Sequence, residues 1–453
     1  AVGIAFFVAA PEPALRGLLA GVIFASAVLL AAKGVSQVFI EHPMTVRMFE
    51  EQRAAVLEAQ GWSADSPMAL AYERRLRQSE ATGWLGMSNV MATTAAAGVV
   101  ALLGFVAAAT KLRERRAGLM LGLCCAAMIA LLGLVLTRSK GGAVALASGL
   151  VLLAASAAWR RLSAPEPRRW KAVIGPCIVL APLALVVVRG VVGERIGELS
   201  LLFRWFYMQA AARIIGEHPV LGVGPVGFKD AYLIAKNPLS PEEVALPHSM
   251  FLDWAATLGL GGWAWACAVL WLISRAGNVL SSRTQPVAPD PALPREVGKV
   301  CFLVLAGATF VAAFIERPIA SVDVLAVRLF GLLAGTAIAA QAVRVVASGA
   351  GGAAASVAIA AAGLTAAIHT QIELTGTHIG AAPWLLAVVG LAGGAWRDAG
   401  AEAVPERGRV PVIVAVVFGC AGLGAAVGAG RAAVWEKELG LAARVVEPIP
   451  ELA

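Results

Sequence analysis

The sequence predicts an all-α, polytopic membrane protein, and three observations support this fold class: an apolar composition, long uncharged runs, and basic clusters between the runs. Hydrophobic residues occupy 59% of the 453 positions and charged residues only 15%, with a mean hydropathy of +0.78. A soluble globular protein has about 25% charged residues. Most of this surface is therefore not predicted to face water.

The apolar residues are gathered in long runs rather than in amphipathic stripes. A helix of roughly 20 apolar residues spans the ~30 Å hydrocarbon core and satisfies its own backbone hydrogen bonds. Runs of this kind, nearly or wholly free of charge, are Leu18–Ala32, Ala95–Thr110, Ala117–Thr137, Ala172–Val188, Cys301–Ile315 and Val412–Gly430.

The net charge of +8 is concentrated in short clusters between the apolar runs, at Lys111–Arg116, Arg160–Lys171 and Arg275–Lys299. Lys and Arg are retained preferentially on the cytoplasmic side of a membrane, so these clusters are expected there. No basic stripe with interleaved aromatic residues occurs, and nucleic acid is not a predicted partner. The 6 cysteines lie in or beside apolar segments, which favours membrane-buried thiols over a disulfide framework or a zinc site.

With the basic clusters inside, the chain threads the membrane about twelve times and its C-terminal tail lies outside. The first segment starts at Ala1 without a charged region before it, so we expect part of a transmembrane helix and not a signal peptide. The expected crossings are Val2–Ala10, Leu15–Lys33, Leu85–Thr110, Ala117–Leu136, Gly142–Ala158, Ala172–Val188, Phe251–Ser274, Val300–Ile315, Val322–Val343, Ala353–Ile368, Ala381–Trp396 and Val410–Ala429.

This threading makes residues 1–453 a single transmembrane domain with two long extracytoplasmic loops, at 34–84 and 189–250. The first loop contains polar helical stretches at Ala54–Gln60 and Met68–Gln78. On the cytoplasmic side, the Pro- and Ser-rich segment Ser281–Pro294 is typical of a flexible linker.

The second long loop contains the residues with the clearest chemical meaning. Arg204 is followed by Trp, Phe and Tyr, and the segment His218–Pro225 reads His-Pro-Val-Leu-Gly-Val-Gly-Pro. Its glycines and prolines predict a tight, irregular turn. An acidic pair and then Pro247-His248 follow, immediately before an apolar helix. An imidazole at the membrane surface can act as a base near neutral pH.

This arrangement resembles the catalytic loop of the O-antigen ligase and polymerase family. Leu136–Gly142 resembles that family's Ser-Arg-Gly element at an outer helix tip, and Gly83–Asn89 weakly resembles a third element. The resemblance spans most of Gly34–Trp271. Two departures bear on substrate: Lys140 stands where the family has Arg, with Arg138 two residues earlier, and Ser249 replaces an Asn after His248. Lysine keeps the charge but loses the bidentate fork that suits phosphate.

The resemblance implies a glycosyltransferase of the bacterial inner membrane with its active site facing the periplasm. Such enzymes move a glycan from undecaprenyl pyrophosphate to a hydroxyl on lipid A-core or on another glycan. Arg204, Arg138 and Lys140 would hold the pyrophosphate without a metal or cofactor, and His248 would take the acceptor's proton, so that displacement inverts the anomeric carbon. Possible supporting residues are Tyr232, Lys236 and Glu243.

Other functions stay open from the sequence. Helix count and loop size narrowly favour a ligase over a polymerase of the same family, and a protein O-oligosaccharyltransferase has a similar build. A transporter would use Asp323, Arg328, His369 and Glu373 as a polar path, but no inverted repeat is visible. A non-catalytic envelope scaffold is a third possibility.

His369 and Glu373 form a second polar cluster that could be functional. They are four residues apart and are expected on one helical face, with His378 beyond. Two or three ligands without supporting groups make an interfacial pair the better interpretation than a metal site. At Arg204 the alternative to function is a cation that snorkels to the interface, and at His248 it is a surface or capping histidine.

Overall fold

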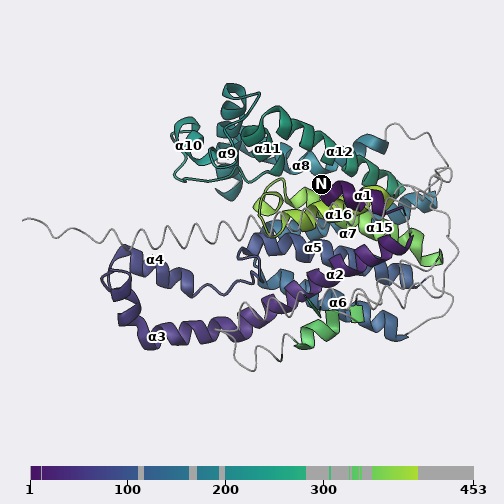
Figure 1. The fold of residues 1–453 in the computed structure, drawn as a ribbon, viewed down its shortest axis with the longest axis horizontal. Coiled ribbons are helices and arrows are strands. Elements are labelled where there is room, and N and C mark those ends of the chain that lie inside the picture. Colours follow the sequence, from purple (N-terminus) through teal and green to yellow (C-terminus); the bar gives the residue numbers. More distant parts are fainter. Residues whose placement is uncertain are drawn as a thin grey trace, which may run out of the picture. The chain divides into compact units, whose positions relative to one another are not determined.

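The computed structural model describes residues 2–11, 13–110, 117–162, 171–192, 199–281 and 349–395, with short stretches between 306 and 338. These residues form helices joined by turns and loops, without a strand among them (Figure 1). The predicted all-α fold class is thereby confirmed. The described residues between 3 and 395 group into one compact unit, and residues 396–453 lie outside the described part of the chain.

Within the described residues, 6 helices are long and apolar enough to cross a membrane. The first of these spans extends beyond α2 through α3. The helices concerned are α2 (Pro13–Ser36), α5 (Ser88–Ala109), α6 (Ala117–Leu136), α7 (Lys140–Leu162), α8 (Lys171–Val192) and α12 (Leu260–Ser281). Shorter apolar helices are α1 (Val2–Ala9), α15 (Gly349–His369) and α16 (Ala382–Gly394). A multi-pass membrane protein follows from these helices.

Some of the expected features cannot be compared with the structure. The crossings expected at 300–315, 322–343 and 410–429, the basic cluster at 111–116 and the linker at 281–294 lie wholly or largely outside the described residues. Asp323 and Arg328 lie there too. The number of twelve crossings therefore stays a prediction.

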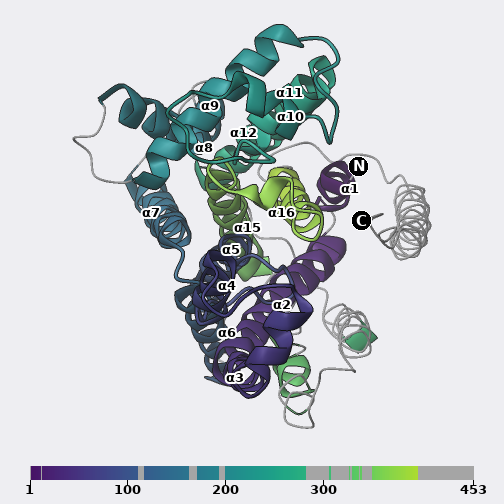
Figure 2. The same ribbon diagram turned by 90° about the vertical axis from the view of Figure 1, so that its left-hand side faces the viewer.

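Helix α15 is the most buried of the described helices, and it packs against α5, α7 and α16 (Figures 1 and 2). Small residues make this packing possible. A Cβ added to Gly104 of α5 would lie 2.3 Å from the Cβ of Ala358, and one added to Gly149 of α7 would lie 2.2 Å from Oγ1 of Thr365. Helices in lipid commonly pack through small residues such as glycine and alanine, because these let the two backbones approach closely.

The first long loop is more helical than the sequence predicts. Helix α2 does not end at Gly34 but continues through a π-helical turn at Gln37–Glu41 into α3 (His42–Ala59). An ion pair of 2.6 Å between Lys33 and Glu41 bridges that turn. The predicted loop from residue 34 therefore begins as a continuation of the helix, and its position outside the membrane stays a prediction.

Helix α4 (Pro67–Leu76) confirms the second polar helical stretch of this loop. Ser66 caps its N-terminus, since the side-chain oxygen accepts the Ala69 N–H at 3.2 Å and Pro67 occupies a first-turn position. An ion pair of 2.7 Å between Arg53 and Glu73 joins α3 to α4. The two helices therefore form a hairpin held by its own polar contacts.

The second long loop consists of α9 (Leu199–Glu217) and α10 (Phe228–Ala235), which pack together and against α11 (Met250–Leu258) (Figure 2). The sequence predicts one helix over Phe251–Ser274, but the structure has a break at Gly259, where φ is +55°. The Leu260 N–H donates to the Val220 carbonyl at 3.0 Å. The break exists because this carbonyl comes so close that a Cβ at Gly259 would lie 2.3 Å from it.

Candidate active site

Arg204 lies in α9, one turn from its start, with its side chain 16% exposed. Its Nε donates to the Ile372 carbonyl at 2.7 Å, and its Nη2 donates to the Glu373 carboxylate. The Nη1 group donates to the Ser200 carbonyl at 3.0 Å and to the Ser200 hydroxyl. The guanidinium is therefore held by the segment that follows α15 as well as by its own helix.

That segment, Thr370–Gly376, joins α15 to α16 and carries an unusual number of buried polar side chains. Thr370, Gln371 and Thr375 are 0–1% exposed, and Glu373 is 5% exposed. Burial raises the pKa of the Glu373 carboxyl, while Arg204 and a hydrogen bond from Asn89 act to lower it. A buried carboxylate is tolerated here because it has a cation and an amide as partners.

The expectation for His369 and Glu373 is wrong in one respect. Helix α15 ends at His369, and Glu373 has an extended backbone, with φ −144° and ψ 162°. The two side chains therefore do not share a helical face. Instead His369 Nδ1 contacts the Thr93 hydroxyl at 2.7 Å, and Glu373 binds Arg204. The described residues contain no cluster of three or more metal-binding side chains.

His248 lies directly before α11 in a backbone conformation that few residues adopt. Its φ is +55°, and Arg138 with φ +54° is the other non-glycine residue with positive φ in the described chain. Such conformations are costly and often occur at functional sites. Both positive-φ positions were singled out by the sequence motifs.

The imidazole of His248 stacks on the ring of Tyr207, with centroids 5.3 Å apart. Its Nδ1 is buried and has no hydrogen-bond partner among the described residues. Burial, and secondly the positive charge of Arg204, lower the pKa of His248 to about 4. The ring is therefore neutral at physiological pH and able to accept a proton.

Tyr207 extends the site toward the acidic pair of the loop. Its hydroxyl donates to the Glu242 carboxylate, and burial together with Glu242 raises the pKa of Tyr207. The next residue, Glu243, is exposed. The sequence analysis named Glu243 as the supporting acid, but Glu242 is the acidic side chain that contacts the ring stacked on His248.

The other two predicted supporting residues have different surroundings. Tyr232 is fully buried in the core of the loop, and its hydroxyl lies 2.9 Å from that of Ser240. Lys236 follows α10 and is half-buried; its backbone N–H donates to the Tyr232 carbonyl at 2.7 Å. These contacts are those of residues that shape the loop.

The glycine-rich turn is docked on the end of α11. The N–H groups of Val223 and Gly224 donate to the carbonyls of Ala256 and Thr257, both at 2.9 Å. Gly222 has φ +67°, and a Cβ there would lie 2.4 Å from the Thr257 carbonyl carbon. Only glycine fits this position, because both its backbone angle and the space around it exclude a side chain.

The helix tip Thr137–Gly141, between α6 and α7, meets the segment after α15. A Cβ at Gly141 would lie 2.6 Å from Nε2 of His369. Arg138 and Lys140 on this tip are exposed, and an Arg138 Nη2 group lies 3.4 Å from the Ser79 hydroxyl. Arg138 and Lys140 therefore lie at the surface, next to the buried contact between Gly141 and His369.

The third, weakly resembling element is joined to the same place. Asn89, in the first turn of α5, acts to lower the pKa of the Glu373 carboxyl, and the Thr93 hydroxyl one turn later contacts both His369 and Thr375. The Ala81 N–H donates to the Leu136 carbonyl at 2.9 Å, which ties this element to the helix tip. All three sequence elements are thus connected through residues 369–375.

The sequence reasoning missed the roles of Glu373, Gln371 and Tyr207. The Ser249 hydroxyl donates to Gln371 at 3.4 Å, and the Met250 N–H donates to the Thr370 carbonyl at 3.3 Å, so this segment also supports the His248 side of the site. The available signal was a run of polar residues, Thr370 to Glu373, between two apolar helices. That run could have been assigned to the motif loop only with knowledge of the packing.

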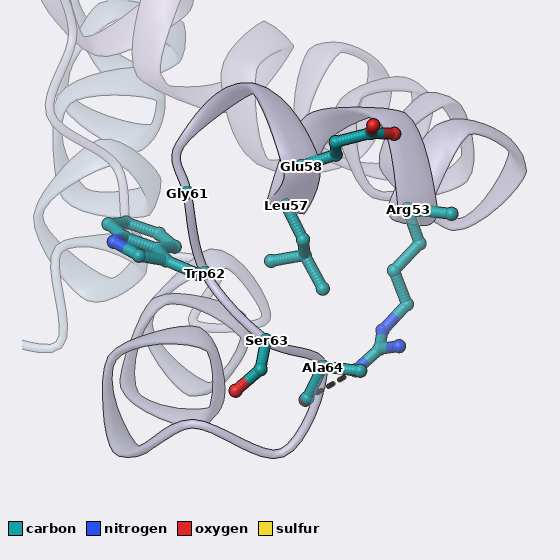
Figure 3. A pocket seen from close by; sticks show the side chains of 8 residues that line it. Arg53, Leu57, Glu58, Gly61, Trp62, Ser63 and Ala64 are labelled. Carbon is teal, nitrogen blue, oxygen red and sulfur yellow. Dashed lines mark hydrogen bonds between the residues drawn. The ribbon is translucent and has the colours of Figure 1, made fainter. Parts of the chain in front are cut away.

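A hollow at the α3–α4 turn lies apart from the motif residues in the sequence. It is lined by residues including Arg53, Leu57 and Trp62, and the Arg53 guanidinium donates to the Ala64 carbonyl at 3.1 Å (Figure 3). None of the motif residues lines it. We therefore place the candidate site at Arg204 and His248 and not in this hollow.

The fold and this site define a multi-pass membrane protein with an arginine and a neutral histidine brought together on a docked loop. Residues 125–267 match the family model described as O-antigen ligase, which confirms the predicted resemblance to that family. The match includes the helix tip, Arg204 and His248 and ends before the segment 370–376. No curated protein and no solved structure matches the chain.

The family indicates a glycosyltransferase-like membrane enzyme that acts on lipid-linked glycans. The family match also weighs against the transporter interpretation. The contacts of two of the four residues predicted to form the transporter's polar path do so as well. His369 and Glu373 are buried and bound to Thr93 and Arg204, so they do not line an open polar path in this structure.

Proposed function

We propose that the protein transfers a glycan from undecaprenyl pyrophosphate to an acceptor hydroxyl at the periplasmic face of the bacterial inner membrane, as an O-antigen ligase that uses lipid A-core. The observation that carries the proposal is the imidazole of His248, which stacks on Tyr207 with its Nδ1 buried and without a hydrogen-bond partner among the described residues, on the same family-matching loop as the Arg204 cation. A polymerase that uses another glycan as acceptor is the alternative within the same chemistry.

In the proposed reaction the acceptor oxygen attacks the anomeric carbon from the face opposite the leaving group. The carbon–oxygen bond to pyrophosphate breaks, its electron pair leaves with the pyrophosphate, and the acceptor proton passes to His248. The product has inverted anomeric configuration. Pyrophosphate is a good leaving group once its charge is held by cations.

Arg204, Arg138 and Lys140 are the proposed holders of that charge. Arg204 also acts on the proposed base, because its positive charge is close enough to His248 to lower the pKa of the histidine. When a diphosphate offsets the Arg204 charge, the pKa of His248 rises toward neutrality, which makes it a stronger base in the loaded site than in the empty one. Proton acceptance is thereby coupled to donor binding.

The test is transfer by the purified, reconstituted protein supplied with undecaprenyl-pyrophosphate glycan and, separately, lipid A-core or glycan acceptors. Transfer to lipid A-core supports the ligase, and chain lengthening supports the polymerase. His248→Ala and Arg204→Ala should each reduce transfer by at least ~100-fold. His218→Ala, an exposed histidine of the same loop, is the matched control and should remain active. Full transfer by folded His248→Ala protein would exclude the mechanism.

A further inference from the structure

Contacts with described residues take four of the five N–H groups of Arg204. Nε donates to the Ile372 carbonyl, both Nη1 hydrogens are directed at Ser200, and one Nη2 hydrogen is directed at Glu373. A guanidinium binds phosphate best through two parallel N–H donors. In this structure the fork is therefore occupied, and a diphosphate cannot engage it fully without displacing a present partner.

Among those partners Glu373 is the only charged one. The side chains of Arg204 and Glu373 are 16% and 5% exposed, so both charges are largely withdrawn from water. A buried cation without a counter-ion is strongly destabilising. Glu373 is the counter-ion of Arg204 in this structure. Its carboxylate occupies an N–H donor of the guanidinium that an anionic ligand could otherwise bind.

Glu373 is also held independently of Arg204. The Asn89 side chain acts to lower the pKa of its carboxyl, and Asn89 lies in α5, a helix that packs against α15. The carboxylate therefore keeps one anchor when Arg204 turns to another anion. The segment that carries it lies outside the residues that match the family model.

We propose that Glu373 is the resident counter-ion of the donor site, paired with Arg204 while the site is empty and replaced on the guanidinium by the diphosphate of the lipid donor. This inference rests on the proposed function, since it takes the donor to be a lipid diphosphate. It makes Glu373 a competitor of the donor for Arg204, so that removal of its charge strengthens diphosphate binding. A residue with a merely structural role would weaken binding when altered.

The experiment measures equilibrium binding of radiolabelled undecaprenyl pyrophosphate, without a glycan, to the full chain in nanodiscs. Glu373→Gln keeps the shape and an acceptor oxygen but removes the charge, and it should bind the lipid diphosphate about tenfold or more tightly than the wild type. Glu373→Asp keeps the charge on a shorter arm and weakens its reach to Arg204. It should give an intermediate gain of about threefold.

The matched control is Glu41→Gln, which cuts another ion pair, that with Lys33 at 2.6 Å, outside the site. Its affinity should stay within about twofold of the wild type. An equal gain in Glu41→Gln would trace the effect to net charge and overturn the proposal. Wild-type or weaker binding by Glu373→Gln would overturn it as well; where that variant does not fold, the same outcome for Glu373→Asp decides.

These results separate the two proposals. If the wild type binds undecaprenyl pyrophosphate but Glu373→Gln binds it no more tightly, the counter-ion proposal fails and the transferase proposal stands. If the wild type itself does not bind the lipid diphosphate, the transferase proposal fails and the counter-ion proposal falls with it.

Discussion

The two long loops of this protein have similar length and polarity in the sequence, yet they differ in how they hold their partly buried arginines. In the α3–α4 hairpin the polar side chains pair within the hairpin: Arg53 binds Glu73, and a His42 ring nitrogen contacts the Leu76 carbonyl at 2.8 Å. In the α9–α10 loop, Arg204 binds a residue 169 positions away in the sequence.

This difference indicates which loop is built for chemistry. Polar contacts within a hairpin stabilise that hairpin and leave its position on the rest of the protein loosely defined. Contacts between a loop and distant helices fix side chains against one another in three dimensions, which a reaction requires. Buried polar side chains concentrate in residues 369–375, which Arg204 contacts, and the non-glycine residues with positive φ among the described residues are His248 of the second loop and Arg138 of the helix tip.

The largest expected effect comes from glycines with positive φ in the two loops. Gly222 has φ +67°, and the Cβ of an alanine there would lie 2.4 Å from the Thr257 carbonyl carbon. Gly61 in the α3–α4 turn has nearly the same φ, +68°, but open space around it. Gly222→Ala should cost more than about 3 kcal/mol and abolish transfer, and Gly61→Ala about 1 kcal/mol with transfer intact. Thermal unfolding and transfer assays measure both. Equal costs would remove the distinction between the loops.

The next effect is a loss of stability in acid that depends on His248. Its pKa is lowered from 6.5 to about 4 by burial and by Arg204, so between these values the unfolded chain binds more protons than the folded one. The contribution of this group is therefore present above pH 6.5 and is lost as pH falls toward 4. The loss amounts to at most about 3 kcal/mol. His248→Gln should flatten the pH dependence of the melting temperature; a slope identical to the wild type would contradict this.

A smaller effect distinguishes the arginines of the two loops. Arg204→Lys keeps the charge but loses the fork and the Nε bond to Ile372, and transfer should fall about 10- to 100-fold. Arg53→Lys, made in the α3–α4 hairpin, should change transfer by less than about twofold, because exposed ion pairs contribute little. Steady-state kinetics with the lipid-linked donor measures both. Comparable losses would show that the hairpin belongs to the site.

The smallest effect concerns the tyrosines of the two loops. Tyr207→Phe removes the hydroxyl that binds Glu242 while keeping the ring that stacks on His248, so transfer should fall about threefold. Tyr72→Phe in α4 keeps the ring contacts with Phe49 and Trp62 and should leave transfer unchanged. A loss of more than about 100-fold in Tyr207→Phe would give its hydroxyl a direct role in the reaction.

Much of the fold and part of the site follow from local sequence. The run Ala117–Leu136 predicts a helix that ends at Leu136 in the structure, because an uncharged segment of that length in lipid must satisfy its own backbone. The break at Gly259 could not be predicted in this way. Its sequence signal is an ordinary glycine in an apolar run, and the reason for the break is the Val220 carbonyl on another part of the chain.

By itself, the sequence determined that this protein is an all-α membrane protein that resembles the O-antigen ligase family and that Arg204, Arg138, Lys140 and His248 are its candidate site residues. Apolar run length and short motifs are local properties, so they can be read without a fold. Only the tertiary structure decided that Glu373 binds Arg204 and that His369 lies against the helix tip. Those partners are far apart in the chain, and which buried charges meet is set by how the helices pack.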